Sequence, residues 1–438
     1  MLGGVFMRDT DGNIGRSSTT STEKVTGLLF DISKQENFFS KGAGLAAKDK
    51  LQGTVVEVNS MDDLDNLGIT AFSGEPEKDL LFGIPYYHIK HFFGIQGDNG
   101  RLFVMFADCK SNWDAIDQMQ RAAHGMINQL GVWTEQSLWK QTGPEAETYS
   151  VDLVTSLNSK AVALAEDNAP LSIILSANSA IVATSDSTSK QVDLSKIPSC
   201  LIDARYVSVV LGQALDTEVS KMQLANKENC TPVGSIGALL GCIAYASVQE
   251  SFAWVNKFNL IGYFPDIEMG FGDVSDSNGN FTSTLKYSSL NKVQLDTLDD
   301  KGYVFLCKYS GLESGVFFSK DQTCANVKSD YRTVARNRTI NKSRRAVRNA
   351  LLPYVNSPLK VDPSTGYLSS AKLTMFHNVV SDVLSTMQDN EEISGYSVTI
   401  DKNQNVLKND TLVIKYSLVP VGVATTIDVV EGLALTNK

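Results

Sequence analysis

The sequence predicts an α+β (mixed α/β) fold in a chain that is long enough to form two or three domains. Its 438 residues are 42% hydrophobic, which is ordinary for a globular protein with buried cores. Short apolar and β-branched runs alternate with amphipathic helical patterns along most of the chain, and this alternation is typical of mixed architectures. The strand-like runs are Thr54–Val58, Arg101–Phe106, Leu171–Ser176, Tyr206–Leu211 and Tyr303–Lys308.

The first residues are predicted to lie outside the body. Residues 17–22 read SSTTST, a polar run that we interpret as a flexible strap between a short N-terminal segment and the body. The N-terminal segment reaches a charge at Arg8 and lacks an apolar core, so we expect no signal peptide. The body is predicted to begin near Val25, with VTGLLFDIS.

Two helical patterns mark the body. Apolar residues between Trp113 and Leu130 recur at spacings of three and four, which predicts one amphipathic helix. Residues 233–248 are apolar but too few to span a membrane. Gly234, Gly237 and Gly241 in this run have helical spacing, which indicates close packing against another helix. The six cysteines are scattered without a CxxC pair, which favours reduced, buried thiols.

The C-terminal region is the most regular. Prolines follow a basic stretch, and a 3-4-3-4 apolar rhythm then predicts an amphipathic helix with Ser369 or Ser370 as its N-cap. GYSVTID and TLVIKYSLVP, separated by the polar turn KNQN, predict two antiparallel strands that end at Pro420. The β-branched residues beyond Pro420 must join their own sheet or that of another molecule. The helix stripe is Leu373, Phe376, Val380, Val383 and Met387.

Charge is distributed unevenly. The formal net charge is -10, which argues against non-specific nucleic-acid or membrane binding as the main role. Between Lys328 and Arg348, however, eight basic residues face a single acid, Asp330, so this stretch carries about +7 and the remainder about −17.

No constellation of catalytic or metal-binding residues is recognisable. G-x-S-x-G, the P-loop and G-x-G-x-x-G are missing, so we expect no enzyme activity and no cofactor. His88 and His91 form an H-x-x-H, but no acid or cysteine stands at ligand spacing, so we predict no metal site. His124 and His377 lie in amphipathic helical patterns, where a partly buried, hydrogen-bonded histidine is ordinary.

These patterns together resemble the contractile tail sheath family, the subunits of phage tails and related contractile injection systems. The resemblance rests most on the basic helix, the proline break and the helix that leads to GYSVTID and LVIKYSLVPVGVATTIDV. In the N-terminal part, TVVEVNSMDDLDNLG and YYHIKHFFGIQGDNGRLFVMF are similar to the family's strand, acidic helix start, double Phe and glycine-rich turn. GSIGALLGCIAYASVQESFAWVNKFNL, residues 234–260, lies where the family has a Gly/Ala-rich helix.

The resemblance implies a structural subunit that forms six-fold rings, stacked helically around an inner tube, and that contracts to drive the tube through a target envelope. The implied partners are further copies of the chain, the inner tube protein, and baseplate and tail terminator proteins, without direct nucleic-acid binding or stable membrane association. The implied location is a virion tail or contractile particle, assembled in the bacterial cytoplasm. The alternative is a monomeric soluble enzyme or a carbohydrate-binding accessory protein of a phage particle.

The resemblance also implies a compact two-domain subunit with extended arms. Residues 1–24 would form the N-terminal arm and strap, 25–325 an outer and middle α/β body with one or two subdomains, 326–420 an inner domain facing the tube, and 421–438 the C-terminal arm. The arms would bind neighbouring subunits by strand addition. The residues implied in this contact are Val5, Phe6, Val423, Thr425, Ile427 and Val429.

The basic stretch is predicted to be a helix over residues 339–355, with an apolar stripe on one face and basic residues on another. Arg344 falls near the stripe, where a buried acid could pair with it. The resemblance implies that this helix docks on an acidic surface of the inner tube. A solvated basic face remains open, and nucleic-acid binding is disfavoured because no aromatic residues interleave the charges. The apolar stripe is Ile340, Val347, Leu351 and Tyr354, and the tube-docking residues are Arg338, Lys342, Arg344, Arg345 and Arg348.

Overall fold

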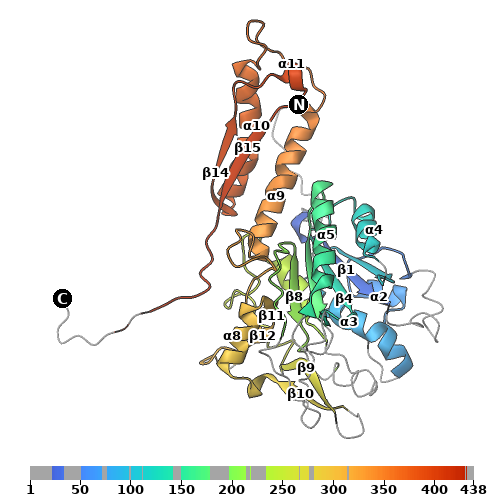
Figure 1. Ribbon diagram of the computed structural model, residues 1–438. Coiled ribbons are helices and arrows are strands. Elements are labelled where there is room, and N and C mark those ends of the chain that lie inside the picture. Colours follow the sequence, from blue (N-terminus) through green and yellow to red (C-terminus); the bar gives the residue numbers. More distant parts are fainter. Residues whose placement is uncertain are drawn as a thin grey trace, which may run out of the picture.

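The computed structural model describes residues 22–33, 51–71, 76–97, 100–110, 112–141, 149–177, 197–213, 218, 233–265, 267–275, 281–312, 315–429 and 431. An α/β body is followed by an elongated C-terminal part that projects from it (Figure 1). Helices and strands both contribute extensively, so the predicted α+β fold class is confirmed.

A seven-stranded sheet runs through the body in the order β11-β8-β7-β4-β1-β3-β2. Neighbouring strands are parallel except for β2, which pairs antiparallel with β3 at one edge. The central strands are buried along their whole length, as expected where helices cover both faces of a parallel sheet. The strands are β1 (Thr26–Asp31), β2 (Val56–Val58), β3 (Leu102–Ala107), β4 (Gln129–Thr134), β7 (Ser172–Ala177), β8 (Val207–Leu211) and β11 (Tyr303–Val304). The five strand-like runs of the sequence are thereby confirmed.

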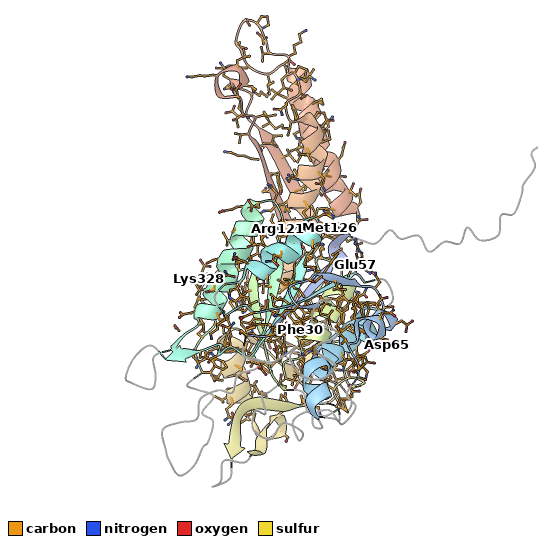
Figure 2. All side chains as sticks on the ribbon, turned by 90° about the vertical axis from the view of Figure 1, so that its right-hand side faces the viewer. Phe30, Glu57, Asp65, Arg121, Met126 and Lys328 are labelled. Atoms are coloured by element: carbon orange, nitrogen blue, oxygen red, sulfur yellow. The ribbon has the colours of Figure 1, made fainter. Side chains whose placement is uncertain are left out.

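Two hydrophobic cores lie on the two faces of this sheet. One core contains residues of α3 (Pro76–Gln96) and α7 (Ile236–Tyr245), and the other contains residues of α4 (Asp114–Ala122) and α5 (Asp152–Glu166). Figure 2 shows side chains filling the body, with Phe30 of β1 in its interior. The remaining elements of the body are η1 (Thr22–Lys24), α2 (Asp62–Leu67), η3 (Tyr287–Ser289), α8 (Lys292–Asp300), and the strand pairs β5 (Lys140–Gln141) with β6 (Tyr149–Ser150), β9 (Glu268–Ser275) with β10 (Phe281–Lys286), and β12 (Leu306–Cys307) with β13 (Phe317–Phe318).

The close helix packing predicted from the glycines is confirmed between α7 and α3. A Cβ atom on Gly237 would lie 2.1 Å from the carbonyl oxygen of His88, and one on Gly241 would lie 3.0 Å from that of Phe92. Only glycine therefore lets the two backbones approach this closely. His88 and His91 are buried in this contact, and burial lowers the pKa of each to about 3, so both rings stay neutral.

The predicted helix between Trp113 and Leu130 is too long. The helix α4 ends at Ala122, and the chain then turns through His124 and Gly125, whose φ angles are 53° and 76°. Leu130 belongs to strand β4. The apolar rhythm continued past Ala122 only because the turn places Met126 against the same core. His124 is consequently an exposed turn residue and not part of a helix.

A buried carboxylate ties together the carboxyl ends of three parallel strands. Asp31, the last residue of β1, accepts hydrogen bonds from Cys109 N after β3 (3.0 Å) and from Thr134 Oγ1 at the end of β4 (2.7 Å). Ser33 N (3.0 Å) and Gln136 Nε2 (2.6 Å) also donate to it. Because donors surround both oxygens, the charge is satisfied internally.

The C-terminal part contains two long helices and a two-stranded sheet. The helices α9 (Val334–Leu351) and α10 (Ser370–Asp389) pack together, and β14 (Ile393–Ile400) pairs antiparallel with β15 (Ile414–Pro420). The predicted helix stripe and the two antiparallel strands are confirmed. Two short elements, η4 (Leu352–Tyr354) and α11 (Val406–Asn409), complete this part. Its small core consists of Val347, Val380, Leu384, Met387 and Ile393.

The described cysteines agree with the prediction of reduced, buried thiols. Cys109, Cys200, Cys242, Cys307 and Cys324 are buried and free, and Cys230 lies outside the described residues. Among the helices that the structure describes, none combines the length and the apolar character that crossing a bilayer requires.

Candidate assembly surfaces

The helix α9 begins inside the body and continues into the C-terminal part (Figure 1). The Thr333 side chain caps it by accepting a hydrogen bond from Arg336 N (3.2 Å). The buried carboxylate of Asp321 accepts from Val334 N (2.8 Å) and Ala335 N (3.2 Å). Burial raises the pKa of Asp321 to about 6, against the opposing effect of these hydrogen bonds and of Arg338. The first turn of α9 is therefore held by two side chains.

Arg338 does not lie on an exposed basic face. It is 4% exposed, and its guanidinium donates to Ala246 O and Ser247 O, both at 3.1 Å, just beyond the C-terminus of α7. Burial lowers the pKa of Arg338 to about 10. The expectation that Arg338 is a surface residue is wrong, because its charge satisfies carbonyl groups at the end of a buried helix.

Lys342 and Arg345 form ion pairs within the chain. Lys342 pairs with Glu392 at the start of β14, and Arg345 pairs with Glu23 in η1 and donates to Pro170 O at 3.2 Å. Both carboxylates belong to residues that are 8% exposed. The expectation of a free basic face is therefore wrong for these two residues as well, because each neutralises a buried carboxylate that would otherwise be unpaired.

Arg344 and Arg348 remain as the less constrained basic residues of this set. Arg344 Nη1 donates to the phenol oxygen of Tyr206 at 3.2 Å, so the hydrogen bond goes to a neutral group and not to the predicted acid. Arg348 is exposed. In the part of the chain that the structure describes, neither residue forms an ion pair.

The sheet of β14 and β15 is open at both edges. Within the described residues, each strand pairs only with the other, so its second edge presents free backbone groups. One face carries partly buried side chains that pack against the small core, such as Tyr396, Val398 and Leu418. The opposite face is exposed and bears Ser397 and Ser417, whose hydroxyls are 2.8 Å apart.

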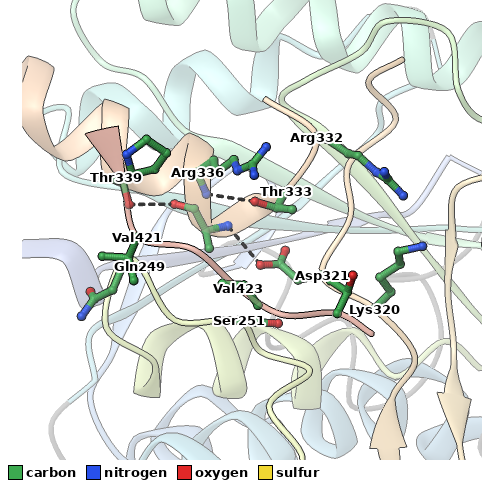
Figure 3. A pocket seen from close by; sticks show the side chains of 13 residues that line it. Gln249, Ser251, Lys320, Asp321, Arg332, Thr333, Arg336, Thr339, Val421 and Val423 are labelled. Carbon is green, nitrogen blue, oxygen red and sulfur yellow. Dashed lines mark hydrogen bonds between the residues drawn. The ribbon is translucent and has the colours of Figure 1, made fainter. Parts of the chain in front are cut away.

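The chain beyond β15 is extended and exposed. Val423 is 49% exposed, Ile427 81% and Val429 76%, and Thr425 is also exposed. None of residues 421–429 belongs to a helix or strand. Where the segment passes the first turn of α9, a cavity of about 160 Å³ lies beneath Val421 and Val423 (Figure 3). The predicted arm residues Val5 and Phe6 lie outside the described residues.

The described residues contain no group of three His, Cys, Asp or Glu side chains that could hold a metal ion. Their charged side chains near α9 are instead arranged in pairs that join distant parts of the chain.

Comparisons with known proteins cover almost the whole chain. Residues 2–322 match the family domain described as DUF2586, N-terminal domain, and residues 330–438 match DUF2586, C-terminal domain. No curated protein matches the chain.

Solved structures of contractile particles share its fold. The helical sheath of the anti-feeding prophage in the contracted state is 14% identical, with a TM-score of 0.55 and coverage of 99% of both chains. A chain of the six-fold symmetrised baseplate of the same prophage matches with the same values. The contracted sheath complex of the extracellular contractile injection system PVC is 13% identical, with a TM-score of 0.56 and coverage of 99% of this chain and 98% of the other. The predicted resemblance to contractile sheath proteins is therefore confirmed at the level of fold.

Proposed function

Because the chain belongs to the DUF2586 family and has the fold of contractile sheath proteins, we propose that it is the structural subunit of a contractile sheath. The observation that carries the proposal is the extent of the structural match, which includes 99% of this chain and 99% of a sheath subunit. Copies of the chain would stack as six-fold rings around an inner tube. Their contraction would drive the tube through a target envelope, without enzymatic chemistry.

The arms would hold neighbouring subunits together. Two open edges of the β14–β15 sheet and the exposed β-branched segment 421–429 are the two halves of a strand-addition contact. A strand that forms about four to six backbone hydrogen bonds, at about 0.5–1.5 kcal/mol each, contributes a few kcal/mol per subunit. Residues 1–24 and 421–438 would be the arms, 25–325 the outer and middle body, and 326–420 the inner domain.

The contact with the inner tube is proposed to lie on this inner domain. Of the basic residues first assigned to it, Arg338, Lys342 and Arg345 have partners within the chain, and Arg344 and Arg348 form no ion pair within the described residues. Baseplate and tail terminator proteins would bind the ends of the sheath. Assembly would take place in the bacterial cytoplasm, with no direct contact to nucleic acid and no stable attachment to a membrane.

Electron microscopy of negatively stained, overexpressed protein tests the proposal. We expect hollow helical polymers with six-fold symmetry, either spontaneously or on addition of an inner tube protein of a contractile particle. A chain that remains a monodisperse monomer at high concentration, with and without that tube protein, would contradict the proposal.

A further inference from the structure

A basic groove lies where the body meets α9. It has a volume of about 480 Å³ and is bounded by the C-terminal half of α5, by Pro170 and Tyr206 at the starts of two central strands, by α9, and by Tyr416 of β15. Four guanidinium groups line it, and Glu166 is the one acid among the lining residues. The four arginines are Arg205, Arg344, Arg345 and Arg348.

Three of these arginines have no carboxylate partner among the described residues. Arg205 lies over the rings of Tyr206 (4.5 Å) and Tyr331 (4.3 Å), and it donates to the Tyr206 phenol oxygen at 2.5 Å. Arg344 donates to the same oxygen. One neutral phenol thus positions two guanidinium groups without neutralising either, and Arg348 adds a third charge at the surface. Such preorganised, unpaired guanidinium groups are suited to bind carboxylates.

We propose that this groove receives an acidic segment of a second copy of the chain, namely the exposed carboxylates of α2. This inference rests on the proposed function, since it requires that copies pack together. Outside its basic stretch the chain carries about −17, so an approaching copy presents a predominantly acidic surface. Asp62 and Asp65 of α2 are exposed, and neither forms an ion pair within the described chain.

The topology prevents α2 from reaching the groove of its own chain. The groove lies at the starts of β7 and β8, whereas α2 follows β2 at the opposite edge of the sheet. Five strand spacings, or about 24 Å, separate β8 from β2. Figure 1 likewise shows α2 on the side of the body away from α9. Because the two surfaces are different and far apart, the contact is heterologous and repeats from copy to copy, as a ring or helical lattice requires.

The test is a charge swap within one chain, measured by sedimentation velocity and electron microscopy over a range of protein concentrations. The double substitution R205E and R348E should raise the concentration needed for self-association about tenfold, because it places like charges opposite each other at every contact. Adding D62R and D65R to the same chain should restore association. Added salt should weaken self-association of the wild type and of the variant with all four substitutions alike. The matched control is R121E, an exposed arginine on α4 outside this groove.

The other outcomes separate a failure of this inference from a failure of the proposed function. Loss of association that the α2 substitutions fail to restore would remove α2 as the occupant, and loss of tube-protein binding with unchanged self-association would assign the groove to the tube. Unchanged association of R205E and R348E would make the groove a solvated face. A wild type that associates into compact oligomers instead of tubes would contradict the proposed function while the charge swap still tests the groove. A wild type that never associates would contradict both.

Discussion

The two sheets of this molecule differ in how completely the chain covers them. The central strands of the body sheet are buried along their whole length between two helical layers. Within the described residues, the β14–β15 sheet has one covered face, one exposed face and two open edges, and it packs on a small core of five buried residues. Two strands are marginal as an independent unit. Within the described residues, the body sheet is therefore covered on both faces, whereas the C-terminal sheet leaves one face and the backbone groups of its edges exposed, where we propose that other copies bind.

The helix α9 connects these two regions through charges that the chain uses internally. Arg338 donates to carbonyl groups of the body, Arg345 pairs with Glu23 in η1, and Lys342 pairs with Glu392 just before β14. A movement of the C-terminal part would be transmitted to the body through these contacts. The following predictions separate the two regions by their response to substitution.

Arg338→Glu should have the largest effect on stability. It removes a buried cation and places a carboxylate against Ala246 O and Ser247 O, so we expect a loss of about 3–5 kcal/mol in the free energy of unfolding. Arg348→Glu, on the exposed side of the same helix, should change it by less than about 0.5 kcal/mol. Urea unfolding followed by circular dichroism measures both. Equal effects would show that Arg338 is not used by the body.

Gly237→Ala should destabilise the body by about 3 kcal/mol, because the added Cβ would meet the His88 carbonyl oxygen at 2.1 Å and the backbones of α3 and α7 would have to separate. Gly395→Ala in β14 is the matched control, since a Cβ there has no neighbouring atom within 4 Å. Thermal unfolding of the two variants provides the comparison. A body that tolerates Gly237→Ala as well as β14 tolerates Gly395→Ala would contradict this account of the α3–α7 contact.

The buried histidines should make the stability of the body depend on pH. Burial lowers the pKa of His88 from 6.5 to about 3, so between these values the unfolded chain binds a proton that the folded chain does not. The contribution of His88 to the free energy of unfolding is therefore complete above pH 6.5. It falls by about 1.4 kcal/mol per pH unit as the pH drops towards 3. Asp321, whose pKa is raised to about 6, acts in the opposite direction between pH 3.8 and 6.

His88→Asn should therefore flatten the decline in unfolding free energy between pH 6.5 and 5. Urea titrations at several pH values measure this slope, which is informative even if the substitution lowers stability overall. His377→Asn, at an exposed position of α10, should leave the slope unchanged. A variant at His88 with the wild-type slope would mean that this histidine is protonated in the folded chain.

Deleting residues 421–438 should have the smallest effect on the fold. The described part of this segment is exposed beyond Val421 and belongs to no strand, so we expect a shift in unfolding free energy below about 1 kcal/mol and unchanged circular dichroism. Polymerisation should nevertheless be abolished, and deletion of residues 1–22 should act in the same way. Unfolding of either truncated chain would place the missing segment in the subunit's own core.

The regular elements could be predicted from the sequence because their periodicity depends only on local burial. The alternating β14 and β15, the stripe of α10 and the apolar runs of the body sheet are examples. The end of α4 could not be predicted in this way, because the apolar rhythm continues through His124 and Gly125 into β4. Strand β4 was missed because Gln129 and Gly131 weaken its β-branched pattern.

The roles of the basic residues could not be predicted from their spacing on α9. Glu23 and Glu392, which pair with Arg345 and Lys342, are distant in sequence, and nothing in the local pattern marks them as buried. The same holds for the carbonyl groups that Arg338 contacts, because backbone acceptors leave no trace in the sequence. An acid that directly precedes the predicted start of the body, as Glu23 does, is a signal to look for a cation elsewhere in the chain.

The claim that neighbouring copies complete the C-terminal sheet is tested most directly by a helical cryo-electron microscopy reconstruction of the polymer. The account predicts that in the polymer the β14–β15 sheet is extended by strands from other copies, with residues 421–429 of one chain hydrogen-bonded at the edge of another. A polymer in which this sheet remains two-stranded, or in which residues 421–429 pair with their own chain, would contradict it.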